Sequence, residues 1–384
     1  MARIDVSDKH SCCGCSACEL SCPAGAIAIE PDDEGFLYPV IDAARCIECG
    51  KCLKACAFRA DKKNPYPRHS GKGVFCYAVQ HIDDAVRAAS RSGGVFTALS
   101  DETLARGGVV YGCVMDGVLR ARHARTDNAD GRDAMRGSKY IESDMRGVFP
   151  LVEADLKAGR EVLFSGTSCQ VAGLRSYLDS EYTSLTCVDI VCHGVPSPRV
   201  WADYVAWMEG VNGGRCTGID FRDKGRFGWR AHIETLYLDD GCEAVSGETF
   251  RQIFYGHKAL RRSCYECPYK SVEHPSDVTI GDYWGIEDAA PEFDDNKGVS
   301  LVLVNTVRGR EAFERCRPVL RWKATKIEKS LQPALRAPFV EPSDRSLFWE
   351  RYGSWDFSRI AKRYGTLTFR ARLGNKFKRV FRLG

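Results

Sequence analysis

CCGCSACELSCP, residues 12–23, places four cysteines at the spacing C-x2-C-x2-C-x3-C before a proline. CIECGKCLKAC, residues 46–56, repeats this spacing, and each of its cysteines stands 34 positions after its counterpart. Three thiolates on one tight loop can bind three irons of a cubane, while the fourth iron needs a thiolate from elsewhere. The duplicated run therefore predicts two 4Fe-4S clusters in an N-terminal dicluster ferredoxin module, residues 1–60.

The fourth cysteine of each run is expected to bind the cluster of the other run, as in two-cluster ferredoxins. The alternative is a pair of zinc sites, although zinc loops usually have paired CxxC units separated by a long spacer. Cys13, beside a ligand, is interpreted as a bystander. Between the runs, AIAIE and FLYPVID flank a polar PDDEG turn, which predicts a hairpin. The first cluster is assigned Cys12, Cys15, Cys18 and Cys56, and the second Cys46, Cys49, Cys52 and Cys22.

The whole chain has the composition of a globular protein in a reducing compartment. Its 384 residues are 44% hydrophobic and 28% charged, and the net charge of +4 gives no indication of nucleic-acid binding. The sequence opens without an apolar segment, and no window approaches the roughly 18 apolar residues of a membrane span, so neither a secretory signal nor a transmembrane helix is expected. Nineteen cysteines without an export signal favour metal binding in a cytoplasmic protein over disulfides.

A polar segment with two prolines, residues 61–73, is interpreted as a linker. After it, strand-like stretches such as GVFCYAVQ, VVYGCVM and EVLFSG alternate with helical stretches such as TSCQVAGLRSYL and SPRVWADYVAWMEG. This alternation predicts a mixed α/β body, so the whole chain is of the α+β or mixed α/β class. Neither G-x-G-x-x-G nor a Walker-type loop occurs, so the sequence carries no Rossmann nicotinamide site and no P-loop.

Four further cysteines stand in turns marked by glycine, proline or histidine. Two of them follow predicted strands, where the loops of α/β sheets gather ligands, and two form a C-x2-C pair of the metal-binding type. We expect the four to hold a third 4Fe-4S cluster, and a zinc site completed by His193 is the alternative. These four are Cys169, Cys192, Cys264 and Cys267. The others, expected in the apolar core, are Cys76, Cys113, Cys187, Cys216, Cys242 and Cys316.

Two glycine-containing turns are candidates for binding a phosphate group. Ser90-Arg91-Ser92-Gly93-Gly94 precedes a predicted helix, whose free N–H groups and adjacent arginine suit an anion, and an ordinary helix cap is the alternative. Arg136-Gly137-Ser138-Lys139-Tyr140 offers two cations, a hydroxyl and an aromatic ring, and a plain surface loop is the alternative. Clusters deliver single electrons whereas most organic substrates take two, so a flavin is the expected second cofactor.

In order along the chain, these motifs resemble the coenzyme F420 hydrogenase/dehydrogenase beta subunit family with a fused N-terminal dicluster ferredoxin. The resemblance is carried by SRSGGVFTAL, RGSKYIES, VLFSGTSCQVAGL, VDIVCHGVPSP, CYECPYK and DVTIGDYWGI. It implies a two-part flavin-binding body, with an N-terminal family domain at 74–155 and a C-terminal one at 160–325. It also implies that the SRSGG and RGSKY turns contact FAD, and that the body cysteines hold a further cluster.

The resemblance implies an FAD-dependent iron–sulfur oxidoreductase. A ferredoxin or a partner subunit is expected to exchange electrons with the N-terminal clusters. The expected acceptor is a small molecule, either the F420 deazaflavin or another compound, such as one linked to polysaccharide synthesis. A non-catalytic subunit that relays electrons to a partner enzyme is the alternative. Candidates for proton delivery or substrate contact are Lys139, Tyr140, His193, Lys270 and Asp282.

The C-terminal segment, residues 326–384, becomes strongly basic toward its end. From residue 357 onward it contains nine Lys or Arg and no acidic residue, with apolar residues between them. A solvated basic helix packed on the body accounts for this pattern. Docking to an acidic partner or to an anionic membrane surface is the alternative.

Overall fold

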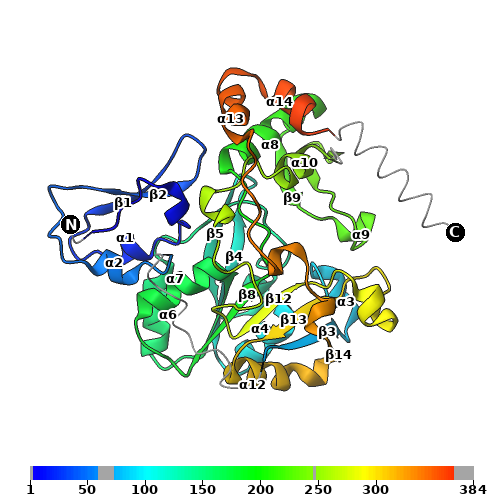
Figure 1. Cartoon of the computed structure of the whole chain (residues 1–384). Helices are drawn as coiled ribbons and strands as arrows, with labels where there is room; N and C mark the ends of the chain where they lie inside the picture. The colour runs from blue at the N-terminus through cyan, green and yellow to red at the C-terminus, as the bar shows by residue number, and fades with distance from the viewer. Residues whose placement is uncertain (1–2, 59–72, 245–247, 367–384) are drawn as a thin grey trace.

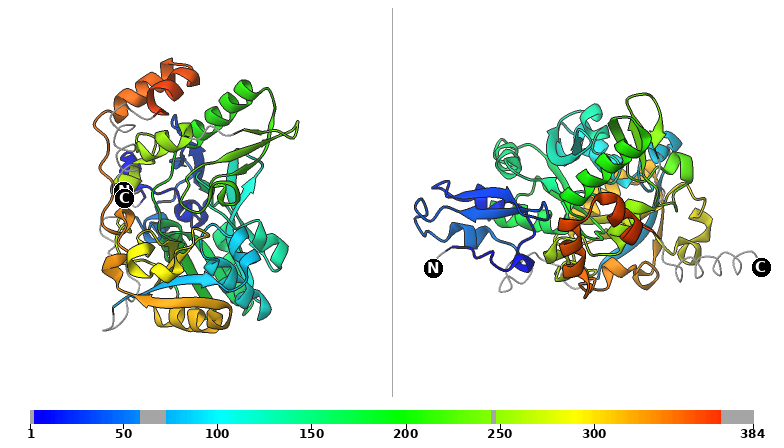
Figure 2. Two further views of the ribbon diagram at one scale, coloured as in Figure 1. Left: turned by 90° about the vertical axis from the view of Figure 1, so that its right-hand side faces the viewer. Right: turned by 90° about the horizontal axis from the view of Figure 1, so that it is seen from above.

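The computed structural model describes residues 3–58, 73–244 and 248–366. A small N-terminal module lies beside a larger mixed α/β body (Figure 1 and Figure 2), which confirms the predicted fold class. All but the last residue of the predicted linker, and the end of the basic tail from residue 367, lie outside the described residues. Within the described ranges, no helix is long and apolar enough to cross a membrane.

The N-terminal module consists of two short helices and one antiparallel hairpin. The hairpin strands pair from Ile27 opposite Ile41 to Pro31 opposite Leu37, as the alternating sequence predicts. Asp32 closes the turn, because its carboxylate accepts the backbone N–H groups of Glu34 and Phe36. The elements are η1 (Lys9–Ser11), α1 (Ala17–Leu20), β1 (Ile27–Pro31), β2 (Leu37–Ile41) and α2 (Lys51–Ala55).

The body is built on a nine-stranded sheet of order β14-β3-β13-β12-β8-β7-β4-β5-β6. The four central strands, β12, β8, β7 and β4, are parallel to one another. Their carboxyl ends meet at one edge of the sheet, so the loops after β7, β8 and β12 converge there. The strands are β3 (Phe75–His81), β4 (Val109–Asp116), β5 (Arg120–Thr126), β6 (Ser143–Asp144), β7 (Val162–Thr167), β8 (Leu185–Ile190), β12 (Val278–Asp282), β13 (Ser300–Val304) and β14 (Leu320–Thr325).

Both faces of the sheet are covered, and the strand side chains alternate between them. Val162 and Phe164 pack with helices α6 and α7, whereas Leu163 and Val188 pack with α4 and α12 on the opposite face. The module joins the first of these cores through Ala17, which is fully buried. The helices around the sheet are α3 (Asp84–Ala89), α4 (Val95–Ala105), α5 (Ala129–Asp133), α6 (Val148–Lys157), α7 (Ser168–Leu178), α11 (Ile286–Ala289) and α12 (Val307–Cys316).

A second layer of the body carries a three-stranded sheet of order β11-β10-β9 together with the C-terminal helices. Phe348 of α13 and Ile360 of α14 pack on Val200 of α8 and Ile253 of α10, at the top of Figure 1. The described part of the basic segment thus packs on the body. The elements are α8 (Pro198–Asn212), β9 (Cys216–Asp220), α9 (Lys224–Phe227), β10 (Thr235–Leu238), β11 (Glu243–Ala244), α10 (Thr249–Tyr255), α13 (Arg345–Ser354) and α14 (Phe357–Tyr364).

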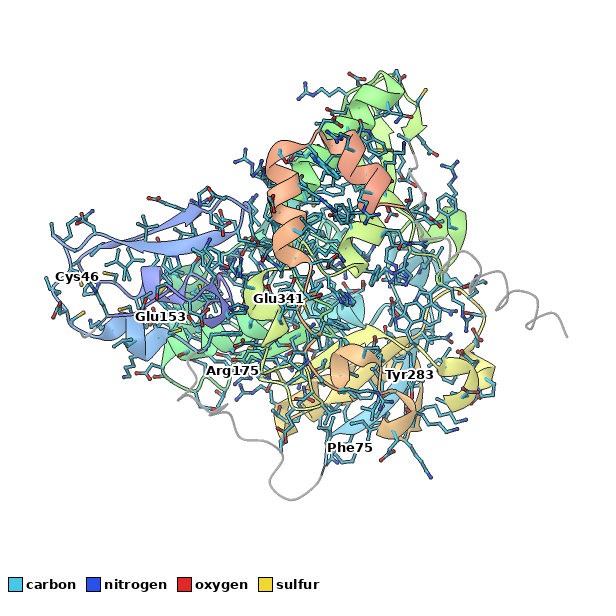
Figure 3. All side chains as sticks on the ribbon, turned by 45° about the horizontal axis from the view of Figure 1, so that its top comes forward. Cys46, Phe75, Glu153, Arg175, Tyr283 and Glu341 are labelled. Atoms are coloured by element: carbon cyan, nitrogen blue, oxygen red, sulfur yellow. The ribbon has the colours of Figure 1, made fainter. Side chains whose placement is uncertain are left out.

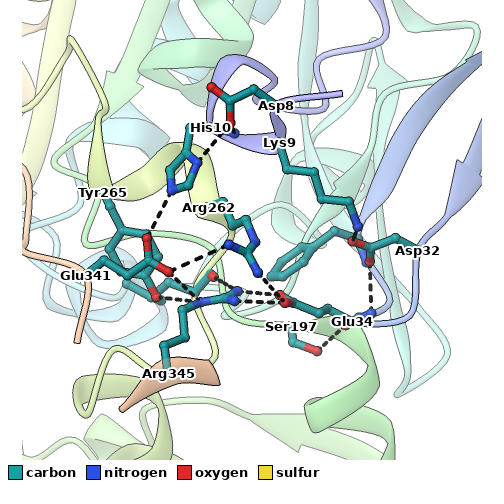
Figure 4. A network of polar contacts seen from close by, with 12 residues as sticks. Asp8, Lys9, His10, Asp32, Glu34, Ser197, Arg262, Tyr265, Glu341 and Arg345 are labelled. Atoms are coloured by element: carbon teal, nitrogen blue, oxygen red, sulfur yellow. Dashed lines mark hydrogen bonds and ion pairs between the residues drawn. The ribbon is translucent and has the colours of Figure 1, made fainter. Parts of the chain in front are cut away.

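Charged side chains fix the hairpin turn of the module to the body (Figure 4). Glu34 of the turn pairs with Arg345, which is 2% exposed, and lies 3.7 Å from Arg262. The imidazole of His10 lies 3.0 Å from the carboxylate of Glu341. Because the arginine is buried and its charge is compensated, this contact holds the module in one orientation.

Candidate functional site

The four thiols assigned to the first N-terminal cluster lie together. Burial, followed by the negative charges of Cys15, Cys12 and Cys56, raises the pKa of the Cys18 thiol well above its ordinary value. These three neighbours and Cys18 are the set that the crossed ligand rule predicts. The chemistry of this donor set, four cysteine sulfurs from two loops, fits a 4Fe-4S cluster.

The four thiols assigned to the second cluster line one small hollow at the far end of the module. Cys46, Cys49 and Cys52 come from the second run, and Cys22 completes the wall from the first. Cys46 lies at the outer end of the module, away from the body (Figure 3), and Cys49 is exposed. The second site is therefore the one that faces solvent, while the first faces the body.

The four body cysteines converge from three separate segments. Cys169 is in the first turn of α7, Cys192 follows β8, and Cys264 is in the short helix η2 (Arg262–Tyr265), three positions before Cys267. Burial, then the charges of Cys264 and Cys169, raises the pKa of Cys192 to about 12. Binding of iron would draw off such thiol protons.

As the side chains stand, no group of three or more His, Cys, Asp and Glu within the described residues could hold a metal ion. The assignment of cluster sites therefore rests on the cysteine sets and their burial, not on preformed coordination. Four partly buried cysteines from three loops are a donor set suited to a 4Fe-4S cluster.

The module and the body meet at sulfur atoms. The partly buried thiol of Cys13 lies beside those of Cys15 and Cys169, which belong to the two neighbouring candidate cluster sites. Helix α7 approaches closely because Gly173 has no side chain, and a Cβ there would stand 2.8 Å from the sulfur of Cys15. Cys13, interpreted from sequence as a bystander, thus lies at the junction between the two sites.

A large pocket of about 560 Å³ opens at the carboxyl ends of β7, β8 and β12. A volume of this size suits an organic cofactor or substrate, and the position is the one where open α/β sheets bind ligands. Cys13, Cys169 and Cys192 form part of its wall, so it adjoins the body cysteines. Predicted residues that line it are Ser90, Arg91, Ser92, Gly94, Arg136, Gly137, Ser138, Lys139, Tyr140, His193 and Asp282.

One wall of the pocket is the SRSGG turn at the start of α4. Gly94, with a φ of 94°, opens the helix, and Val95 and Phe96 also line the pocket. The side chain of Arg91 donates to the carbonyl of Trp229 at 2.6 Å, while its buried Nε has no hydrogen-bond partner within the described part of the chain. A free guanidinium N–H beside a helix N-terminus suits a phosphate group.

Gly93 lies behind this wall and does not line the pocket. Its N–H donates to the Ser300 hydroxyl at 2.9 Å, and a Cβ there would stand 2.1 Å from the carbonyl of Val79. A glycine is therefore needed for close contact between the turn and the sheet, and Gly93 acts on a cofactor only through the position of its neighbours.

Asp282, predicted as a candidate for proton delivery, is held between two arginines. Its carboxylate lies 2.7 Å from Arg222 and 3.7 Å from Arg91, and accepts the indole N–H of Trp229 at 2.8 Å. Burial acts to raise its pKa, but Arg222 and Arg91 outweigh burial and lower that pKa below its ordinary value. Asp282 therefore stays ionised near neutral pH and orients the arginines.

The 136–140 turn also lines the pocket. The ammonium group of Lys139 donates to the carbonyls of Ala134, Arg136 and Gly137, so the side chain folds back and fixes its own turn. Burial lowers the pKa of Lys139 to about 8. The ring of Tyr140 packs edge-on against Phe221 at 5.8 Å. The side chains of Lys139 and Tyr140 are thus held in place by these hydrogen bonds and this ring contact.

His193 and Lys270 meet at the end of the pocket nearest the body cysteines. The two imidazoles of His193 and His257 are 2.8 Å apart, and burial lowers the pKa of His193 to about 3. Lys270 lies outside the pocket wall, where its ammonium group donates to the backbone carbonyl of His193 at 2.7 Å and stands 3.9 Å from the Phe339 ring centre. His193 is therefore neutral, and Lys270 supports the loop that carries it.

Several residues at the site were not predicted from the sequence. Trp284, His232 and Tyr255 form an aromatic wall of the pocket, with the Trp284 and His232 ring centres 5.5 Å apart. Trp284 belongs to the DVTIGDYWGI stretch and lines the pocket, whereas its neighbour Tyr283 is fully buried. Cys242, expected in the core, is exposed, because the turn between β10 and β11 places it at the surface.

Comparison with known proteins finds two matching family models. A family model of the 4Fe-4S dicluster domain matches residues 11–60, and a model of the C terminus of the coenzyme F420 hydrogenase/dehydrogenase beta subunit matches residues 159–330. No curated protein matches the chain. A chain in a xenon-derivatized structure of the F420-reducing NiFe hydrogenase complex from Methanosarcina barkeri is 17% identical, with a TM-score of 0.46 over 78% of this chain and 95% of that chain. The chain is thus an iron–sulfur electron-transfer protein related to the beta subunits of F420 hydrogenase/dehydrogenase, with residues 11–60 similar to 4Fe-4S dicluster domains and residues 159–330 similar to the C terminus of those subunits.

Proposed function

We propose that the chain is an FAD-dependent iron–sulfur oxidoreductase, which passes electrons between a ferredoxin-type partner and a two-electron organic acceptor. The carrying observation is the pocket, which adjoins the body cysteines on one side and the two predicted phosphate-binding turns on the other. A cluster held by the body cysteines and an organic ligand bound in the pocket would therefore be neighbours. The family match of residues 159–330 supports an oxidoreductase of the F420 hydrogenase/dehydrogenase type.

The pocket wall fits the pyrophosphate of FAD. Arg91 supplies a guanidinium that lines the pocket, and the start of α4 supplies backbone N–H groups. A Cβ at Gly137, which has a φ of 79°, would meet nothing within 4 Å, so the second turn leaves room for a ligand. FAD, when bound, supplies the exchange between one-electron and two-electron chemistry.

The chain's own residues give the site its remaining properties. Arg222 and Arg91 hold Asp282 ionised, so two positive charges and one negative charge leave this wall with a net positive charge for an anionic ligand. His193 and His232 remain neutral near pH 7, because burial lowers the pKa of each to about 3. Trp284 and His232 offer flat surfaces for a ring system. A third 4Fe-4S cluster on the four body cysteines would link this pocket to the N-terminal module.

FAD binding tests the proposal through a matched pair of arginines. Arg91→Met removes a guanidinium that lines the pocket, and we expect FAD to bind at least about tenfold more weakly, because a charge-assisted hydrogen bond to phosphate is lost. Arg87→Met removes a buried arginine that is bonded instead to Gly298 and Asp295. Affinities are measured by quenching of flavin fluorescence in the anaerobically purified chain.

Arg87→Met, the control variant, should bind FAD with an affinity within about threefold of that of the unaltered chain. Equal weakening by both substitutions would mean that Arg91 acts only through folding. No binding of FAD by the unaltered chain would exclude the flavoenzyme and favour a cluster relay that serves a partner enzyme.

A further inference from the structure

Arg261 carries a positive charge from the body into the cysteine loop of the module. Its side chain is 1% exposed, and its Nε donates to the carbonyl of Cys12 at 2.9 Å. One Nη donates to the carbonyl of Leu37 at 2.7 Å and lies 3.7 Å from the sulfur of Cys12, within reach of an N–H···S bond. The guanidinium also stands 4.1 Å from the ring centre of Tyr38. A body residue therefore contacts a predicted ligand of the first cluster directly.

Glu142 supplies the counter-charge on the side of Arg261 away from Cys12. Its carboxylate is 7% exposed, pairs with the guanidinium, and accepts the backbone N–H of Leu37 at 3.0 Å. A Cβ at Gly14 would stand 2.6 Å from this carboxylate and 2.8 Å from Arg261. The ion pair is thus packed against the Cys12–Cys15 loop without space between them, and water does not screen it.

We infer that Arg261 and Glu142 set the reduction potential of the N-terminal cluster to which Cys12 belongs, in opposite directions. Reduction adds one negative charge to a 4Fe-4S cluster, and N–H···S bonds and local charge are known determinants of its potential. The guanidinium stabilises the added electron and raises the potential. The carboxylate opposes it and lowers the potential. This inference rests on the cluster assignment of the proposed function, although it does not depend on FAD.

If Arg261 served only to fix the module to the body, its removal would affect the reduction potential no more than removal of another docking arginine. Arg345 provides this control. Arg345 is also buried, at 2% exposed, and also fixes the module to the body through an ion pair, with Glu34. Within the described residues, none of its hydrogen bonds or ion pairs reaches a cysteine. Arg261 and Arg345 thus share the docking function, but only Arg261 touches a cluster ligand.

The test is an anaerobic redox titration of the full chain with its clusters, poised with dithionite and mediators and followed by electron paramagnetic resonance. Arg261→Gln should lower the reduction potential of one cluster by at least about 59 mV. For a one-electron couple this shift is about a tenfold change in the oxidised-to-reduced ratio. Glu142→Gln should shift the same titration to higher potential. Arg261→Lys keeps the positive charge but loses the planar set of guanidinium N–H donors, so its potential should lie between those of the unaltered chain and Arg261→Gln. Arg345→Gln, which weakens docking but removes no contact to a cluster ligand, should shift the titrations much less than Arg261→Gln.

The opposite signs separate the inference from a loss of folding, because a loosened module would shift the potential in one direction whichever partner is removed. Shifts of the same sign, no shift, or an equal shift in Arg345→Gln would overturn it. Absence of any 4Fe-4S signal in the unaltered reduced chain would instead overturn the proposed function, and this inference with it.

Discussion

At the scale of the residue, Lys139 makes the pocket sensitive to pH. Its ammonium group uses three N–H donors on the carbonyls of its own turn, and burial lowers its pKa to about 8. Above that pH the neutral amine has only two N–H donors and no charge, so the turn loses a hydrogen bond and the pocket loses attraction for phosphate. The protonated form, dominant below about pH 8, is therefore the one that favours an anionic ligand.

We expect the affinity for FAD to fall, by up to about tenfold, as the pH rises from about 7 to about 9. Lys139→Met should bind FAD more weakly at pH 7 and should show little change over this range. Flavin fluorescence titrations at several pH values measure both effects. A wild-type affinity that is constant with pH, or a decline that persists in Lys139→Met, would assign the dependence to another group.

Which cysteines lie together was predictable from the sequence only where their spacing within each run is short. The spacing of the two cysteine runs is local, and the crossed sets that it predicts are the sets that lie together in the fold. Arg261 touches Cys12 from 249 positions away, and His232 reaches the pocket from a loop without a motif. Such contacts depend on the tertiary arrangement, which a single sequence does not display.

At the scale of the element, helix α7 depends on a glycine where it meets the module. Gly173→Ala would place a Cβ 2.8 Å from Cβ and Sγ of Cys15, so the helix or the cysteine loop must move. We expect a loss of about 1–3 kcal/mol of stability, as is typical of overpacking, and a lower midpoint of thermal unfolding measured by circular dichroism.

Gly210 in α8 provides the matched control for this prediction. A Cβ there meets nothing within 4 Å, so Gly210→Ala should gain about 0.5–1 kcal/mol from the higher helix propensity of alanine. If both substitutions changed the midpoint of thermal unfolding alike, the close approach of α7 to Cys15 would not constrain the residue at position 173.

Elements with strong periodicity were predicted, and those that depend on their neighbours were not. The strands now labelled β3, β4, β7 and β8 follow from their apolar runs. The sequence of β5, RARHART, carries three arginines, and its strand structure depends on pairing with β4 from Val110 to Asp116. Helix α10 ends at Tyr255, because Gly256 follows and His257 adopts a positive φ of 60°.

At the scale of the whole molecule, the chain arranges its cysteine sites in a line from solvent to pocket. The second N-terminal site is the exposed one, the first contacts the body through Cys13 and Gly173, and the body cysteines adjoin the pocket. The order of the parts along the sequence predicts a ferredoxin module and an α/β body. Which module site faces the body is not predictable, because the duplicated runs are nearly equivalent in sequence.

The docking role of the basic C-terminal end stays a prediction, because residues 367–384 lie outside the described part of the chain. The described end of that segment, α14, packs on α8 and α10. The two domain boundaries within the body likewise remain proposals, since the nine-stranded sheet takes strands from both parts.

The central claim is that one chain holds three 4Fe-4S clusters and one FAD. The most direct test is to purify the chain without oxygen and to measure iron, zinc and acid-released flavin per chain. We expect about twelve iron atoms, about one FAD and little zinc per chain. About eight iron atoms with zinc in the body, or no flavin even after incubation with FAD, would contradict it and leave an N-terminal relay without a two-electron site.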